Sequence, residues 1–381
     1  MKKNLHLILL SLSLILLLFM VGATFYVTYK NFHRDIQYIY VDEKESTPKK
    51  EDEIYKLSFV AAGDALIHNS VYADAYNKLS KTYDFKYQLE LIKPIISKYD
   101  LAFYNQETIF AGAELGYSHF PRFNTPSEFG DAMIDAGFNI VALANNHSYD
   151  KGEVGVLNAV KYFEEQNVLW NGMNNSFEMQ DDIKIMEKNN ITYALISYTT
   201  LNNGLNTPKG KEYLVNYYSD ERAKRDIESI RNKVDVIIVS IHWGVEYTHK
   251  PNANQIKIAN YLSELGVNII CGHHPHVLQP IDKIGNTVVM YSLGNVISSQ
   301  IGVERLTGVL VSLNITKKNG VISIDTPEAE LIYTYRSEPY YIDFKLIPYS
   351  QLDEKHLKNY GDWFEKQKKI ITEYDNNILV R

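Results

Sequence analysis

Short apolar runs that alternate with amphipathic stretches are the feature of this chain that most restricts its fold. The amphipathic stretches, at 127–137, 152–166, 219–233 and 254–266, predict helices, and the runs between them predict buried strands. The runs are KLSFVAAGD, DLAFYNQE, NIVALANNH, DVIIVSIHWG, NIICGHHPH and VVMYSLGN. This order of elements indicates an α/β fold with a sheet of several strands.

The C-terminal third of the chain shows a different pattern. From Gly308 onward, apolar and polar residues alternate, which predicts antiparallel strands that close the domain. No strong linker divides residues 54–349, and 350–381 is charged and predicted to be partly helical. We therefore expect one domain over 54–349, followed by a C-terminal tail at 350–381.

Polar side chains that can bind a metal or a substrate follow the apolar runs. They are Asp64, His68, Asn105, Glu107, Asn145, Asn146, His147, Asp150, His242, Glu246, His274, His276 and Asn295. A lone Asp or Asn at such a place is more often a helix cap or a turn residue. The carboxyl ends of the strands form the binding crevice of an open α/β sheet. Because polar side chains recur after five or six of the apolar runs, we expect them to share one site at this edge.

The sequence CGHHPHVLQP at 271–280 holds three of the eleven histidines of the chain. Pro275 favours an extended backbone at His274, and residues two apart in an extended segment point to the same side. We therefore expect His274 and His276 to direct both rings at one metal ion. The alternative is a polar loop whose histidines bond only to backbone groups.

The donor types narrow the chemistry of this site. Imidazole nitrogens with carboxylate or amide oxygens, and no thiolates, suit a divalent transition metal such as Zn, Mn or Fe. As many as seven plausible ligands exceed what one ion needs, which favours two neighbouring ions, an arrangement that drives hydrolysis of phosphoryl esters and some amides. No G-x-S-x-G elbow or P-loop is present, and Cys271 closes a buried-looking strand, so it is a poor nucleophile.

The N-terminus contains a candidate membrane anchor. No formally charged residue occurs over 5–29, which is long enough to span a bilayer, and Lys2 and Lys3 precede it. This order favours a cytoplasmic N-terminus at 1–4, a transmembrane anchor at 5–29 and an extracellular main domain. A cleaved signal peptide is the alternative, with Val21-Gly22-Ala23 as the cleavage site, although the apolar run continues beyond it. The charged stretch that follows predicts a solvated tether over 30–53.

Charge and cysteine content restrict partners and compartment. The net charge of −7 becomes −10 when residues 1–30, with three lysines and no acids, are set aside. This balance argues against nucleic acid as a partner and against binding to anionic lipid headgroups. The single cysteine, Cys271, excludes an intrachain disulfide, and an exported protein without disulfides suggests a bacterial surface.

Six motifs in order now carry a resemblance to a known family. AAGDALIH, YNQET, ALANNHSYDKG, IHWGVEY, CGHHPHVLQPID and VMYSLGN resemble the successive motifs of the CapA family, over roughly residues 55–346. The resemblance implies a role in capsule or poly-γ-glutamate biosynthesis. It also implies an N-terminal anchor and a fold similar to calcineurin-like metallophosphatases, with two packed sheets flanked by helices.

The resemblance also implies roles for single residues. It assigns metal ligands to Asp64, Asn146, His242, His274 and His276. It implies a catalytic histidine at His147 and leaves His273 as a rim residue outside the final H-x-H pair. The first motif departs from the D-x-H pattern, since Leu66 stands where His is expected and His68 lies two residues further on. The G-D-x-x-D second motif is absent; Asn105-Gln106-Glu107 replaces it, with Glu107 as a candidate bridge between metals.

The predicted site combines metal ligands with catalytic residues. The predicted metal ligands are Asp64, His68, Asn105, Glu107, Asn146, His242, His274 and His276, and the predicted catalytic residues are His147, Asp150 and Glu246. Three functions remain open. The chain is a component of capsule synthesis or export that works with membrane-bound synthase or export subunits, or a metal-dependent hydrolase of a phosphoester or cell-wall substrate, or a binding protein whose metal site has no catalytic use. An anionic polymer or a cell-wall substrate is the expected ligand.

Overall fold

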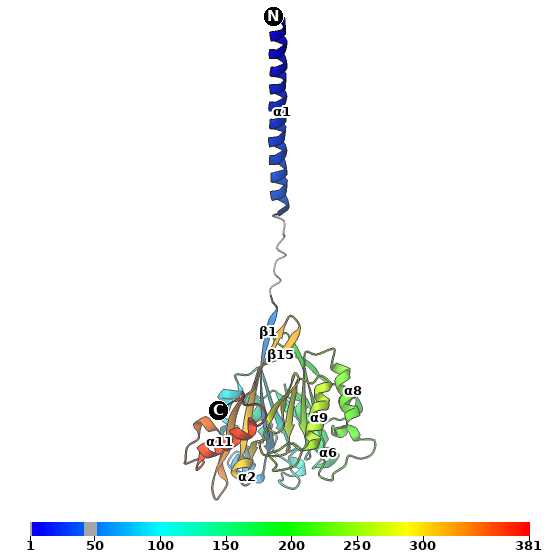
Figure 1. Cartoon of the computed structure of the whole chain (residues 1–381). Helices are drawn as coiled ribbons and strands as arrows, with labels where there is room; N and C mark the ends of the chain where they lie inside the picture. The colour runs from blue at the N-terminus through cyan, green and yellow to red at the C-terminus, as the bar shows by residue number, and fades with distance from the viewer. Residues whose placement is uncertain (1, 42–51) are drawn as a thin grey trace. The chain divides into compact units, whose positions relative to one another are not determined.

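The N-terminal part of the chain forms one long helix. In the computed structural model, which describes residues 2–41 and 52–381, helix α1 spans Lys2–Val41 (Figure 1). Its stretch Asn4–Phe32 is long and apolar enough to cross a membrane. This stretch contains the whole of the predicted anchor at 5–29. The helix continues into the predicted tether, the rest of which lies mostly outside the described residues.

The remainder of the chain, Glu53–Arg381, is a second compact unit built around two sheets. The first sheet is mixed, with the strand order β17-β16-β14-β1-β4-β5-β6, and β13, β15 and β18 pair with its strands β1, β14 and β16. Its strands are β1 (Ile54–Leu66), β4 (Leu101–Gln106), β5 (Ile140–Ala142), β6 (Leu169–Asn171), β13 (Asn295–Ser298), β14 (Thr307–Lys318), β15 (Val321–Ile324), β16 (Glu328–Ser337), β17 (Ile342–Pro348) and β18 (Leu379–Val380).

The second sheet has the strand order β11-β12-β10-β9-β8-β7. Its strands are β7 (Ile185–Lys188), β8 (Ile191–Thr199), β9 (Val236–His242), β10 (Ile269–His273), β11 (Ile281–Ile284) and β12 (Thr287–Met290). A small separate hairpin joins β2 (Tyr76–Asn77) to β3 (Thr82–Tyr83). The antiparallel strands predicted beyond Gly308 are confirmed by β14, β15, β16 and β17.

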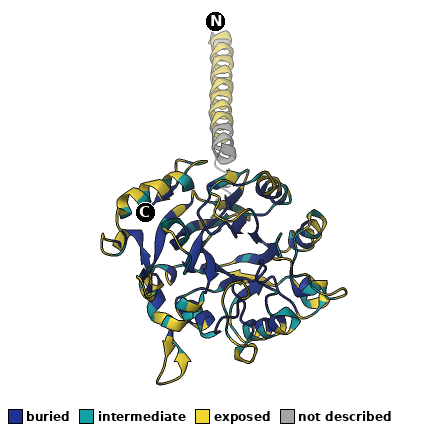
Figure 2. Ribbon diagram, turned by 90° about the horizontal axis from the view of Figure 1, so that it is seen from below, coloured by how far each residue is buried: buried dark blue, intermediate teal, exposed yellow. Residues whose placement is uncertain are grey.

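The two sheets pack face to face. One buried cluster contains Phe59 and Phe103 of the first sheet together with Leu195, Ile238 and Ile269 of the second. Two further clusters cover the outer faces, one under the helices that follow β1 to β5 and one under α8 (Asp220–Ile230) and α9 (Ala253–Glu264). Buried residues accordingly fill the strands, while the helices expose their outer sides (Figure 2). The predicted fold, two packed sheets flanked by helices, is confirmed.

The helices of this unit are α2 (Asn69–Asp74), α3 (Lys86–Leu89), α4 (Lys93–Ile96), α5 (Glu128–Asp135), α6 (Gly152–Glu164), α7 (Phe177–Asp181), α8 (Asp220–Ile230), α9 (Ala253–Glu264), α10 (Val303–Leu306) and α11 (Tyr360–Ile371). Helices α5, α6, α8 and α9 agree closely with the four predicted amphipathic stretches, whereas the short helices α2, α3, α4, α7 and α10 were not predicted. Helix α9 begins with a capping box between Asn252 and Gln255, and Gly266, with φ 87°, follows its end. The tail at 350–381 contains α11, as expected, and buries Ile371 between the sheets.

Strand β1 delivers the first site residue. It lies between β14 and β4, and every residue from Phe59 to Leu66 is buried. Because both faces of the sheet are covered here, the strand is almost continuously apolar rather than alternating. A rise of about 3.3 Å per residue puts Asp64 roughly 33 Å from Ile54, so the chain enters this unit at the end of β1 opposite the site (Figure 1).

Candidate metal centre

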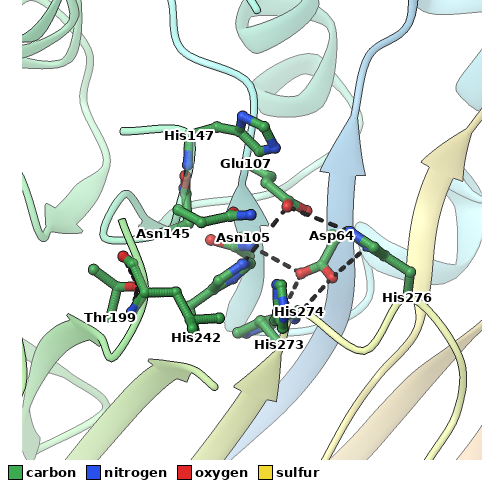
Figure 3. A network of polar contacts seen from close by, with 12 residues as sticks. Asp64, Asn105, Glu107, Asn145, His147, Thr199, His242, His273, His274 and His276 are labelled. Atoms are coloured by element: carbon green, nitrogen blue, oxygen red, sulfur yellow. Dashed lines mark hydrogen bonds and ion pairs between the residues drawn. The ribbon is translucent and has the colours of Figure 1, made fainter. Parts of the chain in front are cut away.

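The register of the strands brings the predicted ligands together. Asp64 at the end of β1 lies beside Asn105 of β4 and Asn295 of β13, and His242 at the end of β9 lies beside His273 of β10. Both sheets therefore contribute side chains to one buried cluster (Figure 3). This is the shared edge that the sequence predicted from polar residues after successive apolar runs.

Asp64 is the centre of this cluster. Its Oδ1 accepts a hydrogen bond of 2.9 Å from Nδ2 of Asn105 and lies 2.9 Å from Nδ1 of His273. Its Oδ2 accepts a hydrogen bond of 3.2 Å from the backbone N–H of His274 and lies 3.3 Å from Nδ1 of His276. Burial alone would raise the pKa of Asp64, but the two histidine rings hold that pKa well below its usual value. The carboxylate is therefore ionised inside the protein.

A glycine allows Asp64 to reach this position. A Cβ built on Gly63 would lie 1.9 Å from the carbonyl oxygen of Gly294, so no larger residue fits where β1 approaches the segment before β13. The backbone N–H of Asp64 donates to that same oxygen over 2.9 Å. The glycine of the sequence A-A-G-D thus allows β1 to place the Asp64 carboxylate near the end of the strand.

Glu107 faces Asp64 across the cluster and is fully buried. Its Oε1 lies 3.6 Å from Nε2 of His242 and 3.6 Å from Nε2 of His276, too far for a hydrogen bond. Burial raises the pKa of Glu107 well above its usual value, and the Asp64 carboxylate adds to that rise against the opposing effect of His276. A carboxyl group in this position is stabilised by a cation placed among these rings.

Several other buried donors and acceptors in the described residues also lack a hydrogen-bond partner. They are Oδ1 of Asn105, both carboxylate oxygens of Glu107, Oδ1 of Asn146, both ring nitrogens of His242 and Nδ1 of His274. Buried polar atoms are nearly always hydrogen-bonded, and leaving one unpaired costs about 1–3 kcal/mol. Atoms without a partner also occur outside the cluster, in Gln88, Thr334 and Gln367, but those of the cluster are the nitrogen and oxygen ligands that a metal ion takes.

The protonation states agree with this view. Burial, aided by the neighbouring His276, lowers the pKa of His274 to about 3, so its ring is neutral at physiological pH. Burial also lowers the pKa of His242 well below its usual value. For His276, burial acts in the same direction, but Glu107 and Asp64 outweigh it and raise the pKa to about 9. Neutral imidazole is the form that binds a metal, and an ion between Glu107 and His276 would take the place of the proton.

Within residues 2–41 and 52–381, two sets of three side chains have ligand atoms within 4.8 Å of one another. One set is Asp64, Glu107 and His276, which is fully buried, and the other is Glu246, His274 and His276, in which Glu246 is exposed. His276 belongs to both. This arrangement of imidazole and carboxylate groups fits a divalent metal.

His147 lies beside the cluster and is held from both sides. Its Nδ1 lies 2.8 Å from Oδ2 of Asp150, and that oxygen also accepts the backbone N–H of Phe123 over 2.6 Å. The ring of Phe123 packs edge-on against His147, with centroids 4.7 Å apart, and Asn145 accepts the backbone N–H of His147. Asp150 thus orients the imidazole and leaves Nε2 as the nitrogen available to a substrate.

Two of the predicted histidine ligands, His68 and His242, lie outside both ligand sets, although Nε2 of His242 lies 3.6 Å from Oε1 of Glu107. Nδ1 of His68 lies 3.0 Å from the carbonyl oxygen of Leu66, and its ring packs against Phe123 at 5.6 Å. Burial lowers the pKa of His68 to about 4. Nδ2 of Asn146 donates to Oδ1 of Asn203 over 3.3 Å, and its buried Oδ1 has no hydrogen-bond partner among the described residues.

The backbone argument for His274 and His276 is wrong, although their rings converge at 5.9 Å. Extended backbone was expected before Pro275, but φ is 95° at His274 and 56° at His276, in the left-handed region. The loop curls because the N–H of His274 donates to Asp64 and the carbonyl oxygen of Pro275 accepts from Tyr247. Contacts across the fold, rather than the local preference set by proline, bring the two rings together.

His273 is not a rim residue, as was expected, but is 1% exposed and lies against Asp64. Alternation along β10 could have shown this, because Cys271, two residues earlier, is buried between the sheets. Asn295, which the sequence analysis left without a role, holds His276 by a contact of 2.9 Å between Oδ1 and Nδ1. Such a partner for the second nitrogen orients a ligand ring and leaves Nε2 for the metal.

Comparison with known proteins assigns the family. Residues 58–300 match the family described as bacterial capsule synthesis protein PGA_cap. The chain belongs to this family. The CapA resemblance read from the six motifs is thereby confirmed, and the match covers every predicted site residue from Asp64 to His276.

Two curated relatives carry related names. The PGA biosynthesis protein CapA of Bacillus subtilis (strain 168) is 32% identical over 54% of this chain and 55% of its own length. The capsule biosynthesis protein CapA of Bacillus anthracis is 26% identical over 73% of this chain and 68% of its own. The chain thus spans about half the length of the first relative. Among solved structures, it is similar to a candidate 5′-nucleotidase from Staphylococcus aureus, with a TM-score of 0.48 and 15% identity over 81% of this chain and 59% of that one.

Proposed function

We propose that this PGA_cap family chain is a membrane-anchored, extracytoplasmic component of capsule synthesis or export, acting on poly-γ-glutamate through a metal centre in its sheet domain. The single observation that carries the site is the set of buried ligand atoms without hydrogen-bond partners, supplied by both sheets. Family membership supports the capsule role, because the relatives are named for it. The partners are membrane-bound synthase or export subunits, and the substrate is the anionic polymer.

The N-terminal helix supports membrane anchoring. Asn4–Phe32 has the length and hydropathy of a membrane span, and the basic residues Lys2 and Lys3 precede it. An excess of lysine on the N-terminal side favours a cytoplasmic N-terminus. The sheet domain then lies outside the cell, where the capsule is assembled.

The donor set supports a divalent transition metal, Zn, Mn or Fe, and two ions sharing His276. Asp64, Glu107 and His242 would hold one ion from the two sheets, and His274 with Glu246 would hold the other. Such ions supply Lewis acidity to a substrate oxygen and neutralise negative charge. Cys271 is not a ligand, because it is fully buried and burial raises the pKa of its thiol far above its usual value.

A second candidate function is hydrolysis, which the pairing of His147 with Asp150 favours. Nδ1 of His147 is engaged by the carboxylate, so protonated Nε2 can donate its proton to a leaving group. A ring that served only in packing would not need a buried carboxylate to orient it. If the metal served only to stabilise the fold, by contrast, His147 would have no function at this site.

Replacement of the chromosomal gene by point variants tests these roles, with cell-surface polymer and metal content of the purified full chain as readouts. His276→Ala should abolish both polymer and most of the bound metal, since His276 belongs to both ligand sets. The control Glu164→Gln, at an exposed position of α6, should change neither. Parental polymer output from a His276→Ala strain that has lost its metal would refute the metal-dependent role.

His147→Ala separates catalysis from scaffolding. One acid–base group contributes about 10²–10⁴-fold to a rate, so a hydrolytic role predicts a fall of that size in polymer processing with metal content unchanged. If the variant retains metal and makes polymer at the parental rate, hydrolysis through His147 is excluded, and the metal centre acts as a binding scaffold.

A further inference from the structure

An aromatic side chain stands beside the metal centre and is fixed in place. Tyr247 has φ 62°, which its backbone N–H stabilises by a 2.8 Å hydrogen bond to the carbonyl oxygen of Pro275. The ring centroids of Tyr247 and His276 are 6.3 Å apart, and the ring is 42% exposed. Tyr247 also follows Glu246, a member of one ligand set. Its ring therefore forms part of the wall between the ligands and solvent.

An arginine lies flat over this wall. Cζ of Arg305 is 3.8 Å from the centre of the Tyr247 ring, a cation–π contact at close range. Within residues 52–381, no carboxylate pairs with this guanidinium, whereas Arg336 contacts Glu338 and Arg222 contacts Asp226. The ring beneath holds the guanidinium in place, and its N–H groups are available to a ligand.

The position of Arg305 is coupled to a metal ligand. Nδ2 of Asn295 donates to the carbonyl oxygen of Arg305 over 2.8 Å, while Oδ1 of Asn295 contacts Nδ1 of His276. The same Nδ2 donates to Gln300, whose own amide donates to the hydroxyl of Tyr247 over 3.3 Å. The amide of Asn295 therefore orients the ligand ring and the backbone of the arginine together.

The charged groups around Arg305 indicate which ligand it can bind. The centre carries the carboxyl groups of Asp64, Glu107 and Glu246, which repel an anionic substrate until cations neutralise them. A planar guanidinium beside them offers parallel donors that match a carboxylate in a bidentate pair. A γ-linked glutamate chain has one free carboxylate next to each amide linkage, so binding one carboxylate here would present a neighbouring linkage to the metals.

We propose that Arg305, supported by the ring of Tyr247, is a substrate-binding residue that takes a free α-carboxylate of the polymer at the edge of the metal centre. This subsite rests on the proposed function, since it names how that polymer is held. It assigns Arg305 no part in the chemistry. The motif HWGVEY and the short helix α10, which follows VMYSLGN in the chain, thereby share a purpose, because one provides Tyr247 and the other Arg305.

Binding of a γ-linked glutamate oligomer to the metal-loaded full chain in detergent tests the subsite. Arg305→Gln should weaken binding about 10- to 100-fold, the effect of losing a hydrogen-bonded ion pair. The affinity of Arg305→Lys should lie between those of the parent and Arg305→Gln, because lysine keeps the charge but not the planar donors. Tyr247→Phe should bind nearly as the parent does, since the ring remains. The matched control Lys224→Gln removes one positive charge from exposed α8 and should have no effect.

The ligand and the metal are controlled separately. A γ-linked glutamate oligomer whose α-carboxylates are converted to amides lacks the charge; it should bind equally to the parent and to Arg305→Gln, and metal content should be the same in both. Inorganic phosphate is the competing anion; preferential binding of phosphate, with no response of the glutamate oligomer to Arg305→Gln, would overturn the carboxylate subsite. That result would leave the proposed function standing if His276→Ala still abolishes polymer, so the two failures can be told apart.

Discussion

Metal binding should stabilise the sheet domain, and replacing His276 should remove that effect. The perturbation is His276→Ala, compared with the parent in a chelator and with added Zn or Mn. His276 has ligand atoms in both sets, and the remaining members, Asp64, Glu107, Glu246 and His274, lie in or just after β1 and β4 of the first sheet and β9 and β10 of the second. Because unfolding of either sheet separates these atoms, the ion binds the native state and has little affinity for the unfolded chain.

The size of the effect follows from mass action. Binding to the native state alone contributes about 2.7 kcal/mol at a metal concentration 100 times Kd, and about 4.1 kcal/mol at 1,000 times Kd. An unfolding entropy of about 2.1 cal/mol/K per residue gives roughly 0.7 kcal/mol/K for the unit Glu53–Arg381. The parent should therefore gain about 4–6 °C in Tm on metal addition.

Thermal unfolding of the full chain, followed by near-UV circular dichroism, measures this shift. His276→Ala should show little of it, whatever its own stability in chelator. The control His356→Ala removes another histidine of Glu53–Arg381, one that contacts Asp353, and should retain the whole metal-induced shift. A shift of parental size in His276→Ala would show that the ion binds elsewhere and would refute the assignment.

Three further predictions concern other parts of the molecule. Asp150→Asn, which loses the carboxylate against Nδ1 of His147, should reduce polymer processing while metal content stays constant. Asp235 is partly buried, which raises its pKa, but Lys317 at 2.8 Å and Thr192 lower it below the usual value. Its stabilising effect is therefore complete above about pH 4 and is lost as pH falls through the depressed value, so Asp235→Asn should flatten the acid limb of a plot of unfolding free energy against pH. Protease added outside intact cells should remove the chain beyond about Val41; full protection would reverse the proposed topology.

The sheet edge could be predicted because its signal repeats. Asp64, Asn105 and His242 each end a buried run, and parallel neighbours bring such ends to one line whatever the details of the loops. The helices could be predicted for a similar reason, since α6 and α8 begin and end within three residues of the predicted limits. Both patterns are local in sequence, because these strands are buried on both faces and these helices on one.

The loops could not be predicted, because their conformation depends on contacts from distant parts of the chain. Pro275 alone favours extended backbone, yet hydrogen bonds from His274 to Asp64 and from Tyr247 to Pro275 hold the loop in left-handed geometry. His68 lies only four residues beyond Asp64, but its ring contacts Phe123 because β1 ends at Leu66 and the chain turns away from the metal centre. Nothing within a few residues of either histidine shows this outcome.

Asn295 connects the two functions that the site would need. It is the first residue of β13, where pairing with Asp64 of β1 places its amide between the ring of His276 and helix α10, which bears Arg305. An amide can do this because its oxygen accepts a hydrogen bond from the imidazole, while its nitrogen donates one to a carbonyl group. An aspartate of the same shape would offer no donor to that carbonyl oxygen and would add a fourth carboxylate to the centre. Loss of this amide should therefore disturb metal and polymer binding together, whereas loss of the Arg305 guanidinium should disturb polymer binding alone.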